Sequence, residues 1–254
     1  MNNNVEKQTP LVSIITIVYN GIDTLEQTIK SIINHQYKNI EYIIVDGNSS
    51  DGTIELIKRY EKHISKWISE PDKGLYDAMN KGMKLASGDY FWFINSGDEI
   101  ASQDVLTTIF NNNELADIYY GETLVFDQNN TIIGNRRLTP PENLSWKDFR
   151  RGMLVSHQSL IVSRNVCGEY NINYKFSADF EWALLALKHA QSIRNTGLVL
   201  SKFLDGGLTK KNIIPSLKER FRIMRKYYGL IPTVFYHIPI SIRFVFYYIR
   251  NKRF

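Results

Sequence analysis

A chain of 254 residues is long enough for one large α/β domain or two small ones, and its core needs no disulfide bonds. An apolar fraction of 43% and a charged fraction of 22% exclude the collagen-like, disordered and disulfide-rich classes. A net charge of +5 is compatible with nucleic acid, an anionic membrane surface or phosphorylated substrates.

The N-terminal segment and the cysteine content favour a cytoplasmic protein. The start of the chain lacks the charged segment, apolar run and small-residue cleavage site of a secretory signal. Cys167 is the single cysteine, so no intrachain disulfide can form. We therefore expect the protein to work in the cytoplasm.

Strand and helix patterns alternate along the first part of the chain. The β-branched run at 11–20 (LVSIITIVYN) predicts a buried strand that opens into a loop, and 40–46 predicts a second strand. Apolar residues at helical spacing in 23–36 separate the two strands, and Asp51-Gly52-Thr53 predicts the start of a second helix. This order is typical of an α/β fold, in which right-handed crossovers connect the strands of a parallel sheet.

The pattern changes in the second half of the chain, where short strands follow one another. The remaining predicted elements are strands at 66–70, 89–95, 116–126, 131–135 and 155–164, and helices at 74–87 and 177–190. The strands on either side of residue 130 predict a small antiparallel hairpin added to the sheet. The helix at 177–190 is predicted to be amphipathic.

Polar residues follow the strands at the edge where ligands of parallel sheets bind. The carboxylates that gather there are Asp46, Asp72, Asp98 and Glu99. Such carboxylates repel one another, and Mg²⁺ or Mn²⁺ relieves the repulsion, commonly together with substrate phosphates. The alternative is that Asp98 and Glu99 cap a helix that begins near Ser102 or solubilise a turn.

The loop at 45–53 (VDGNSSDGT) contains neither the dinucleotide fingerprint nor the P-loop spacing. Asp46 ends its strand with what we expect to be a free carboxylate. Such a group can accept hydrogen bonds from a ribose or a base N–H. The alternative is a residue that only stabilises the turn.

Four blocks of sequence, taken together, resemble the family-two glycosyltransferases with the GT-A fold. The blocks are VSIITIVYNGIDTLEQTIKSI, IEYIIVDGNSSDGT, SEPDKGLYDAMNKGMKLASGDY and FINSGDE. Within the family, the chain is similar to bacterial enzymes of surface polysaccharide assembly, of the colanic-acid and O-antigen type. The resemblance implies a GT-A domain at 1–210, with a mostly parallel central sheet flanked by helices, and a helical tail at 211–254.

The family also implies which residues border the donor nucleotide. In its members the ends of the first two strands, the loop before the third helix and the metal motif surround the nucleoside diphosphate sugar. The corresponding residues here are Tyr19, Asn20, Asp46, Asp72, Lys73, Gly74, Asn95 and Ser96. Asp46 matches the residue that contacts the base.

The metal motif of the family commonly reads Asn-Ser-Asp-Asp or Asp-x-Asp. This chain has Asn95-Ser96-Gly97-Asp98, so Gly97 replaces the first acid. Asp98 falls at the position of the direct metal ligand, which implies that it holds Mg²⁺ or Mn²⁺. The side chain of Glu99 would point away from that of Asp98 if the strand geometry persists.

Inverting sugar transfer needs a base that deprotonates the acceptor hydroxyl. The resemblance implies that Asp179 is this base, although Ala178 replaces the acid that usually precedes it. The structural alternative for Asp179 is an acid favoured by the helix dipole. Glu181 is the nearest rival for the role, and His157 and Glu181 are candidates for the acceptor side. A hydrogen-bonded structural histidine is the equal alternative for His157.

The C-terminal tail is basic and aromatic. Lys and Arg gather after residue 209, where Glu219 is the only acid. The apolar runs of 229–254 are interrupted by Pro232, Pro239 and Arg243 and are too short for a membrane-spanning helix. The composition fits a helix that lies on an anionic membrane surface; a core-packed helix or a homodimer contact is the alternative. We expect no binding to nucleic acid, because no reader motif accompanies the charges.

These features predict an inverting glycosyltransferase that uses Mg²⁺ or Mn²⁺ at the cytoplasmic face of the inner membrane. It would move a sugar from a nucleoside diphosphate sugar to a glycan or lipid-linked glycan. One alternative is a non-catalytic sugar-nucleotide-binding relative, because Gly97 and Ala178 replace usual acids. The other is a sugar nucleotidyltransferase, which would need a Gly-rich basic loop that residues 18–24 do not supply. A Gly-rich loop near the site is also expected at 204–209.

Overall fold

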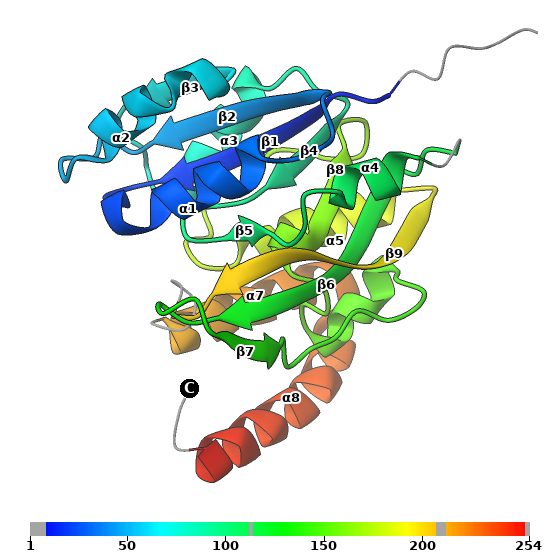
Figure 1. Ribbon diagram of the computed structural model, residues 1–254. Helices are drawn as coiled ribbons and strands as arrows, with labels where there is room; N and C mark the ends of the chain where they lie inside the picture. The colour runs from blue at the N-terminus through cyan, green and yellow to red at the C-terminus, as the bar shows by residue number, and fades with distance from the viewer. Residues whose placement is uncertain (1–8, 112–113, 207–211, 252–254) are drawn as a thin grey trace, which may run out of the picture.

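The computed structural model describes residues 9–111, 114–206 and 212–251 (Figure 1). The strands are β1 (Val12–Val18), β2 (Ile40–Asp46), β3 (Lys66–Ser69), β4 (Tyr90–Phe93), β5 (Glu99–Ile100), β6 (Ile118–Phe126), β7 (Ile132–Asn135), β8 (Leu160–Ser163) and β9 (Ile193–Leu204). The α-helices are α1 (Ile22–Ile33), α2 (Thr53–Arg59), α3 (Leu75–Leu85), α4 (Val105–Phe110), α5 (Ala178–His189), α7 (Ile213–Tyr228) and α8 (Leu230–Asn251). Short 3₁₀ turns are η1 (Glu61–His63), η2 (Trp146–Arg151) and η3 (His157–Ser159).

One nine-stranded sheet runs through the molecule in the order β3-β2-β1-β4-β8-β6-β9-β5, with β7 paired to β6. The first four strands in this order are parallel to one another. β8 is antiparallel to both β4 and β6, whereas β6 and β9 are parallel. The predicted mixed α/β fold with a hairpin addition at β6–β7 is therefore confirmed.

The central strands are apolar on both faces because helices cover both sides of the sheet (Figure 1). Every residue of β1 is buried. Ile15 packs with α3 on one face, and Ile14 packs with α1 on the other. A Cβ atom at Gly82 of α3 would lie 2.5 Å from Ile15 Cγ2, so a glycine is needed for this close approach.

Several elements differ from the sequence-based expectation. The predicted strand at 155–164 is shortened to β8, and the placement of His157 on a strand is wrong because it lies in η3. α5 is buried on most sides rather than amphipathic, since sheet, η2 and α7 surround it. α4 begins at Val105 after Asp104, and Glu99 belongs to β5, so the helix-cap alternative for Asp98 and Glu99 is also wrong.

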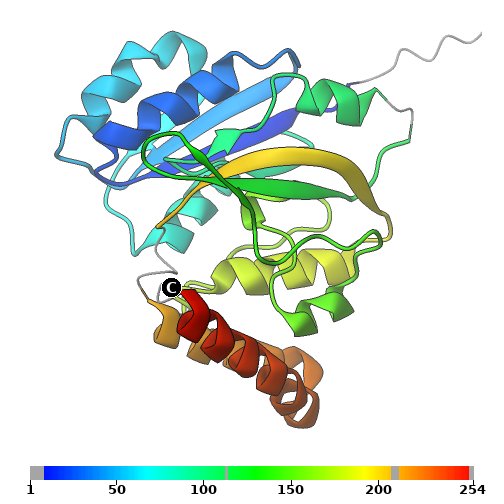
Figure 2. The same ribbon diagram turned by 60° about the horizontal axis from the view of Figure 1, so that its bottom comes forward.

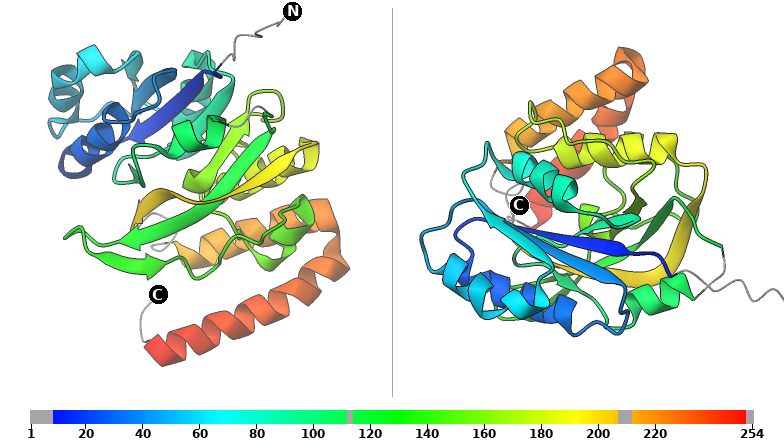
Figure 3. Two further views of the ribbon diagram at one scale, coloured as in Figure 1. Left: turned by 45° about the vertical axis from the view of Figure 1, so that its right-hand side comes forward. Right: turned by 90° about the horizontal axis from the view of Figure 1, so that it is seen from above.

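The C-terminal helices pack on the domain and against each other (Figures 2 and 3). Ile223 and Met224 of α7 belong to the same apolar core as α3 and α5. The rings of Phe221 and His237 join α7 to α8, with centroids 4.9 Å apart. Within the described ranges, no helix combines the length and apolar character needed to cross a membrane.

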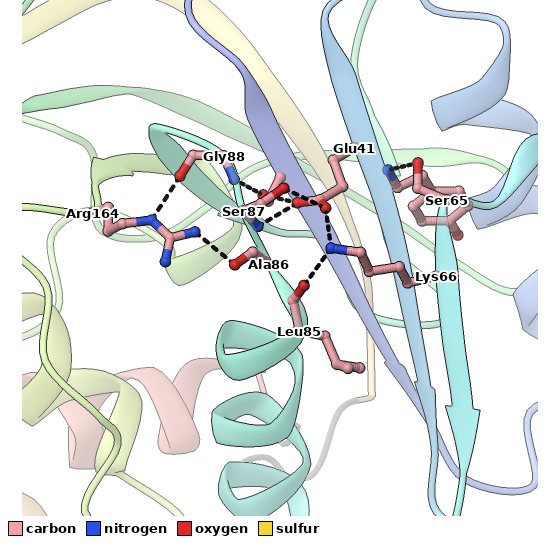
Figure 4. A network of polar contacts seen from close by, with 10 residues as sticks. Glu41, Ser65, Lys66, Leu85, Ala86, Ser87, Gly88 and Arg164 are labelled. Carbon is pink, nitrogen blue, oxygen red and sulfur yellow. Dashed lines mark hydrogen bonds and ion pairs between the residues drawn. The ribbon is translucent and has the colours of Figure 1, made fainter.

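A buried carboxylate, that of Glu41, connects the amino-terminal ends of the parallel strands (Figure 4). Glu41 of β2 accepts hydrogen bonds from Ser13 Oγ at 2.6 Å and Lys66 Nζ at 2.7 Å. Ser87 adds its backbone N–H at 2.6 Å and its hydroxyl at 2.7 Å. Burial raises the pKa of Glu41, but the four donors outweigh it and lower the pKa to about 2. The network thereby links β1, β2, β3 and the loop before β4.

We predict that Glu41→Gln lowers the free energy of unfolding at pH 7 by about 2–3 kcal/mol. The folded pKa lies below the ordinary value of 4.5, so this stabilisation is present above pH 4.5 and is lost as the pH falls towards about 2. The variant should therefore flatten the pH dependence in that window. Urea unfolding at several pH values measures this, with exposed Glu55→Gln as the control. Equal pH profiles for wild type and Glu41→Gln would contradict the assignment.

Candidate active site

The loops after β1 and β2 are tied together by their polar side chains. The backbone N–H of Asn20 donates to Ser49 Oγ at 2.7 Å, and Asn20 Oδ1 accepts the N–H of Ser50 at 3.0 Å. Asn20 has a left-handed backbone, with a φ of 47°. The neighbouring Tyr19 side chain is exposed. Asn20 thus shapes the loop, while Tyr19 is open to a ligand.

Asp46 is fully buried at the end of β2. It accepts hydrogen bonds from Ser49 N at 2.9 Å, from Ser49 Oγ and from Ser69 Oγ at 2.6 Å. The expectation of a free carboxylate is therefore wrong, because three donors of the chain already occupy it. In this conformation, Asp46 positions Ser49 and, through it, Asn20.

The side chains of Tyr19 and Asp72 both lie next to Gly47. A Cβ atom at Gly47 would lie 2.6 Å from Asp72 Oδ2 and 3.2 Å from Tyr19 Cδ2, so the absence of a side chain makes room for both. Asp72 Oδ1 accepts the N–H of Gly74 at 2.7 Å, immediately before α3. Lys73 is exposed beside it. The structure thus assembles four of the predicted nucleotide-site residues: Tyr19, Asp72, Lys73 and Gly74.

The segment after β4 forms a turn that buries its polar atoms. The N–H of Asp98 donates to the carbonyl of Asn95 at 2.9 Å, and Gly97 between them has a φ of +95°. Ser96 Oγ lies 2.9 Å from Thr24 Oγ1 of α1. Asn95 Oδ1 is buried and has no hydrogen-bond partner. Because a side chain at residue 97 would be strained, the backbone itself disfavours the acid that the family has there.

Asp98 is 4% exposed and is held between two other segments. Its Oδ2 accepts from Gln158 Nε2 at 2.8 Å, and its Oδ1 accepts the N–H of Leu204 at 3.2 Å. Burial raises the pKa of Asp98 to about 7, against the opposing effect of these two hydrogen bonds. Glu99 does not join it, since its carboxylate pairs with Lys202 Nζ at 3.3 Å across β5 and β9.

The side-chain oxygens of Asn95 and Asp98 would fit a hard divalent cation if substrate oxygens completed its coordination. In the part of the chain that the structure describes, no three His, Cys, Asp or Glu side chains converge as a metal cage. The unpartnered oxygen of Asn95 and the Asp98 carboxylate, which meets only neutral donors, are the available ligands. One carboxylate plus substrate phosphates is a common way for proteins to hold Mg²⁺.

Asp179 lies in the first turn of α5 and is partly exposed. Its Oδ1 accepts the hydroxyl of Tyr76 at 3.1 Å and the N–H of Phe180 at 2.9 Å. Oδ2 accepts no hydrogen bond from any described residue. Since Tyr76 closely follows Gly74, its hydroxyl places Asp179 beside the loop that precedes α3. Sequence reasoning missed Tyr76, although it lies within one of the quoted blocks.

The two candidates for the acceptor side are buried in hydrogen-bond networks. His157 Nε2 contacts the hydroxyl of Tyr170, and burial lowers the pKa of His157 to about 4, which keeps the ring neutral. Glu181 accepts from Lys226 Nζ at 2.9 Å and Tyr227 OH at 2.8 Å, which joins α5 to α7. Both side chains thus adopt structural arrangements. The neighbour of His157, Gln158, donates a hydrogen bond to Asp98, the predicted metal ligand.

The Gly-rich loop expected at 204–209 lies partly outside the described residues, which end at 206 and resume at 212. Its first residue contributes the Leu204 N–H to Asp98.

Comparison with known proteins identifies the family. A model described as Glycosyl transferase family 2 matches residues 13–169. An uncharacterised glycosyltransferase of Mycobacterium tuberculosis is 33% identical over 186 residues, which cover 70% of this chain and 69% of that protein. A putative teichuronic acid biosynthesis glycosyltransferase of Bacillus subtilis is 27% identical over 70% of this chain and 73% of its own length.

Solved structures share the fold at low sequence identity. Staphylococcus aureus TarS in complex with UDP-GlcNAc has a TM-score of 0.64 and 14% identity, covering 85% of this chain and 66% of that one. The mannosyltransferase PcManGT of Pyrobaculum calidifontis, in complex with GDP-Man and Mn²⁺, has a TM-score of 0.60 and 13% identity, covering 92% and 75%.

We predict that restoring the acid by Gly97→Asp destabilises the protein by about 1–3 kcal/mol, because the backbone is left-handed there. Its Cβ would also lie 3.1 Å from Leu204 Cδ2. Denaturant unfolding measures the change. Gly168→Asp is the matched control, since no atom lies within 4 Å of its Cβ position. Equal losses at the two positions would refute the backbone explanation.

Proposed function

The chain belongs to glycosyl transferase family 2, and from this premise we propose that it is an inverting glycosyltransferase using a nucleoside diphosphate sugar. The observation that supports this most directly is the geometry of Asp179. Tyr76 and Phe180 hold one carboxylate oxygen, and the other accepts no hydrogen bond from the described residues. A carboxylate fixed on one side and open on the other suits a general base.

In the proposed reaction, Asp179 Oδ2 accepts the proton of an acceptor hydroxyl as its oxygen attacks the anomeric carbon. A bond forms between that oxygen and the anomeric carbon, and the bond from this carbon to the diphosphate breaks on the opposite face. The configuration therefore inverts. A bound Mg²⁺ or Mn²⁺ would stabilise the charge of the departing diphosphate, and Asp98 and Asn95 are the residues that would hold it.

The relatives support the donor class and the pathway that we propose. TarS binds UDP-GlcNAc, and PcManGT binds GDP-Man with Mn²⁺, which supports a sugar nucleotide with a divalent cation. The name of the Bacillus subtilis relative supports assembly of a surface glycan. We extend this to a lipid-linked glycan acceptor and to the colanic-acid and O-antigen type of pathway. The presence of both Asp98 and Asp179 favours catalysis over a binding-only relative, and the family match favours it over a nucleotidyltransferase.

We also propose that α8 places the enzyme on the cytoplasmic face of an anionic membrane. Large apolar side chains are exposed along one stripe of this helix: Ile231 (83%), Phe235 (69%), Ile238 and Ile242. Their spacing of four, three and four residues puts them on one helical face. On its other side α8 is anchored, since Thr233 is buried and Tyr236 packs on the core.

The charge of the neighbouring helix favours a lipid surface over a second copy of the chain. α7 exposes Lys218, Arg222 and Arg225, which recur at helical spacing. Cations on the helix that packs against α8 complement anionic headgroups, whereas they would repel the same cations of a second copy.

We predict that Asp179→Asn reduces sugar transfer by about 10²–10⁴-fold while donor binding persists, because only the base is removed. Asp98→Asn should instead abolish the dependence of the donor-induced thermal shift on Mn²⁺. Thermal shifts with UDP-, GDP- and dTDP-sugars, with and without Mn²⁺, measure donor binding, and release of the nucleoside diphosphate measures transfer. Exposed Asp23→Asn is the control. Full activity of Asp179→Asn would move the base elsewhere.

For the membrane, we predict that the double variant Ile231→Glu, Phe235→Glu binds phosphatidylglycerol vesicles at least about tenfold more weakly than wild type. The control carries Ile132→Glu and Ile133→Glu on β7, where both side chains are also exposed. Vesicle co-sedimentation measures binding. Unchanged binding of the α8 variant, or a dimer that the same variant dissociates in the absence of lipid, would contradict the proposal.

A further inference from the structure

Arg220 of α7 presents a guanidinium without an acceptor next to the proposed base. Its Cζ lies 5.8 Å from the ring centroid of Phe180, the residue that follows Asp179. Its Nε is shielded from solvent and has no hydrogen-bond partner. No described residue accepts a hydrogen bond from this side chain or forms an ion pair with it. Burying a donor without a partner is unfavourable, so the arrangement needs an explanation.

A second guanidinium, that of Arg136 directly after β7, lies within electrostatic range of Arg220 and Asp179. Its Nη2 donates to the carbonyl of Met153 at 3.3 Å, and it forms no ion pair with the described residues. Burial lowers the pKa of Arg136 to about 10, and the positive charge of Arg220 contributes to this shift. The ring of Phe149, in the same segment as Met153, packs on that of Phe180 with centroids 5.4 Å apart, so both arginines contact segments that meet at Phe180.

The nearby carboxylates, Asp179 and Glu122, form no ion pair that would neutralise Arg136. The negative charges of Asp179 and Glu122 act on Arg136, but neither carboxylate lies within ion-pair distance of it. Glu122 Oε2 is itself buried without a partner, and burial raises the pKa of Glu122. Two arginines that have only distant counter-charges are typical of a site that binds an anion in a bidentate manner.

The position in the fold separates this pair from the predicted nucleotide site. Tyr19, Asp72 and the loop before α3 lie at the β1–β2 side of the sheet, whereas β6 and β7 lie on the far side of β8. Arg136 follows β7 on that far side, and Arg220 of α7 packs against the ring of Phe180, the residue after Asp179. An anion held by this pair would therefore lie on the β6–β7 side of the proposed base, away from the ends of β1 and β2.

We propose that Arg136 and Arg220 form a subsite for a phosphate or diphosphate group carried by the acceptor. This inference rests on the proposed role of Asp179 as the base, since that role defines the acceptor side. The subsite would hold a phosphorylated acceptor so that its hydroxyl reaches Asp179 Oδ2. It would favour acceptors that carry phosphate near the attacking sugar over neutral glycans.

Inorganic pyrophosphate is the probe, titrated calorimetrically into the full chain without divalent cations, first alone and then with saturating UDP. We expect wild type to bind pyrophosphate in both conditions. Arg136→Gln and Arg220→Gln should each weaken this binding by about tenfold or more, because a hydrogen-bonded charge is lost. Arg222→Gln, an exposed change of equal charge on α7, is the matched control. Arg220→Lys retains the positive charge, and it replaces Arg220→Gln in the titration if the glutamine variant does not fold.

The proposal is overturned if the variants at 136 and 220 bind pyrophosphate as tightly as the Arg222→Gln control, or if UDP displaces the pyrophosphate. Displacement would assign the arginines to the donor diphosphate instead. Because the titration involves no turnover, it is independent of the test of the proposed function. Asp179→Asn should bind pyrophosphate at least as well as wild type, even though its transfer activity is lost.

Discussion

The buried carboxylate of Asp98 is the constraint on which the arrangement of the site depends. An anion shielded from water is costly unless donors or a cation compensate for it. Here Gln158 from η3 and the backbone of Leu204 at the end of β9 supply neutral donors. Three distant segments of the chain are thereby fixed around one carboxylate. These neutral donors leave the negative charge of Asp98 without a counter-charge. A divalent cation that also binds substrate phosphates would supply that counter-charge.

The second half of the site is organised by α5 and its neighbours. α3 supplies the Tyr76 hydroxyl to Asp179, and α7 holds the segment that leads into α5. Glu219 of α7 accepts the backbone N–H groups of Lys175 and Phe176 at 2.9 and 2.8 Å. The start of α5 is therefore held from both sides, by Tyr76 of α3 and by Glu219 of α7.

The sequence predicted the parts of the fold that are encoded by local patterns. The apolar runs of β1 and β2 and the helical spacing of α1 and α3 are strong signals because each element buries its own face. β9 was missed because its segment contains Arg194, Asn195 and Gly197, and its conformation is imposed by pairing with the distant β6. The pattern likewise could not show that Asp46 is occupied by Ser49 and Ser69, since hydrogen bonding depends on tertiary placement.

The same limit applies to the site. The family motif located Asp98 and Asp179 along the chain, and the structure added their partners Gln158 and Tyr76. Arg136 and Arg220 carry no motif, and their relation to Asp179 depends on tertiary packing, against Met153 for Arg136 and against Phe180 for Arg220. Gly97 looked like a lost acid in the sequence, but its left-handed φ of +95° makes it a backbone requirement.

The contacts of α7 determine where the C-terminal segment could be exchanged for that of another family member. Ile223 and Met224 fill the common core, and Glu219 fixes the approach to α5, so α7 is integral to the catalytic unit. Gly229, with a φ of +84°, is the single residue that joins α7 to α8. Exchange of C-terminal segments between family members would thus be modular only if the junction lies at Gly229. A junction upstream of α7 would remove, along with the tail, the Glu219 contacts that hold the segment before Asp179.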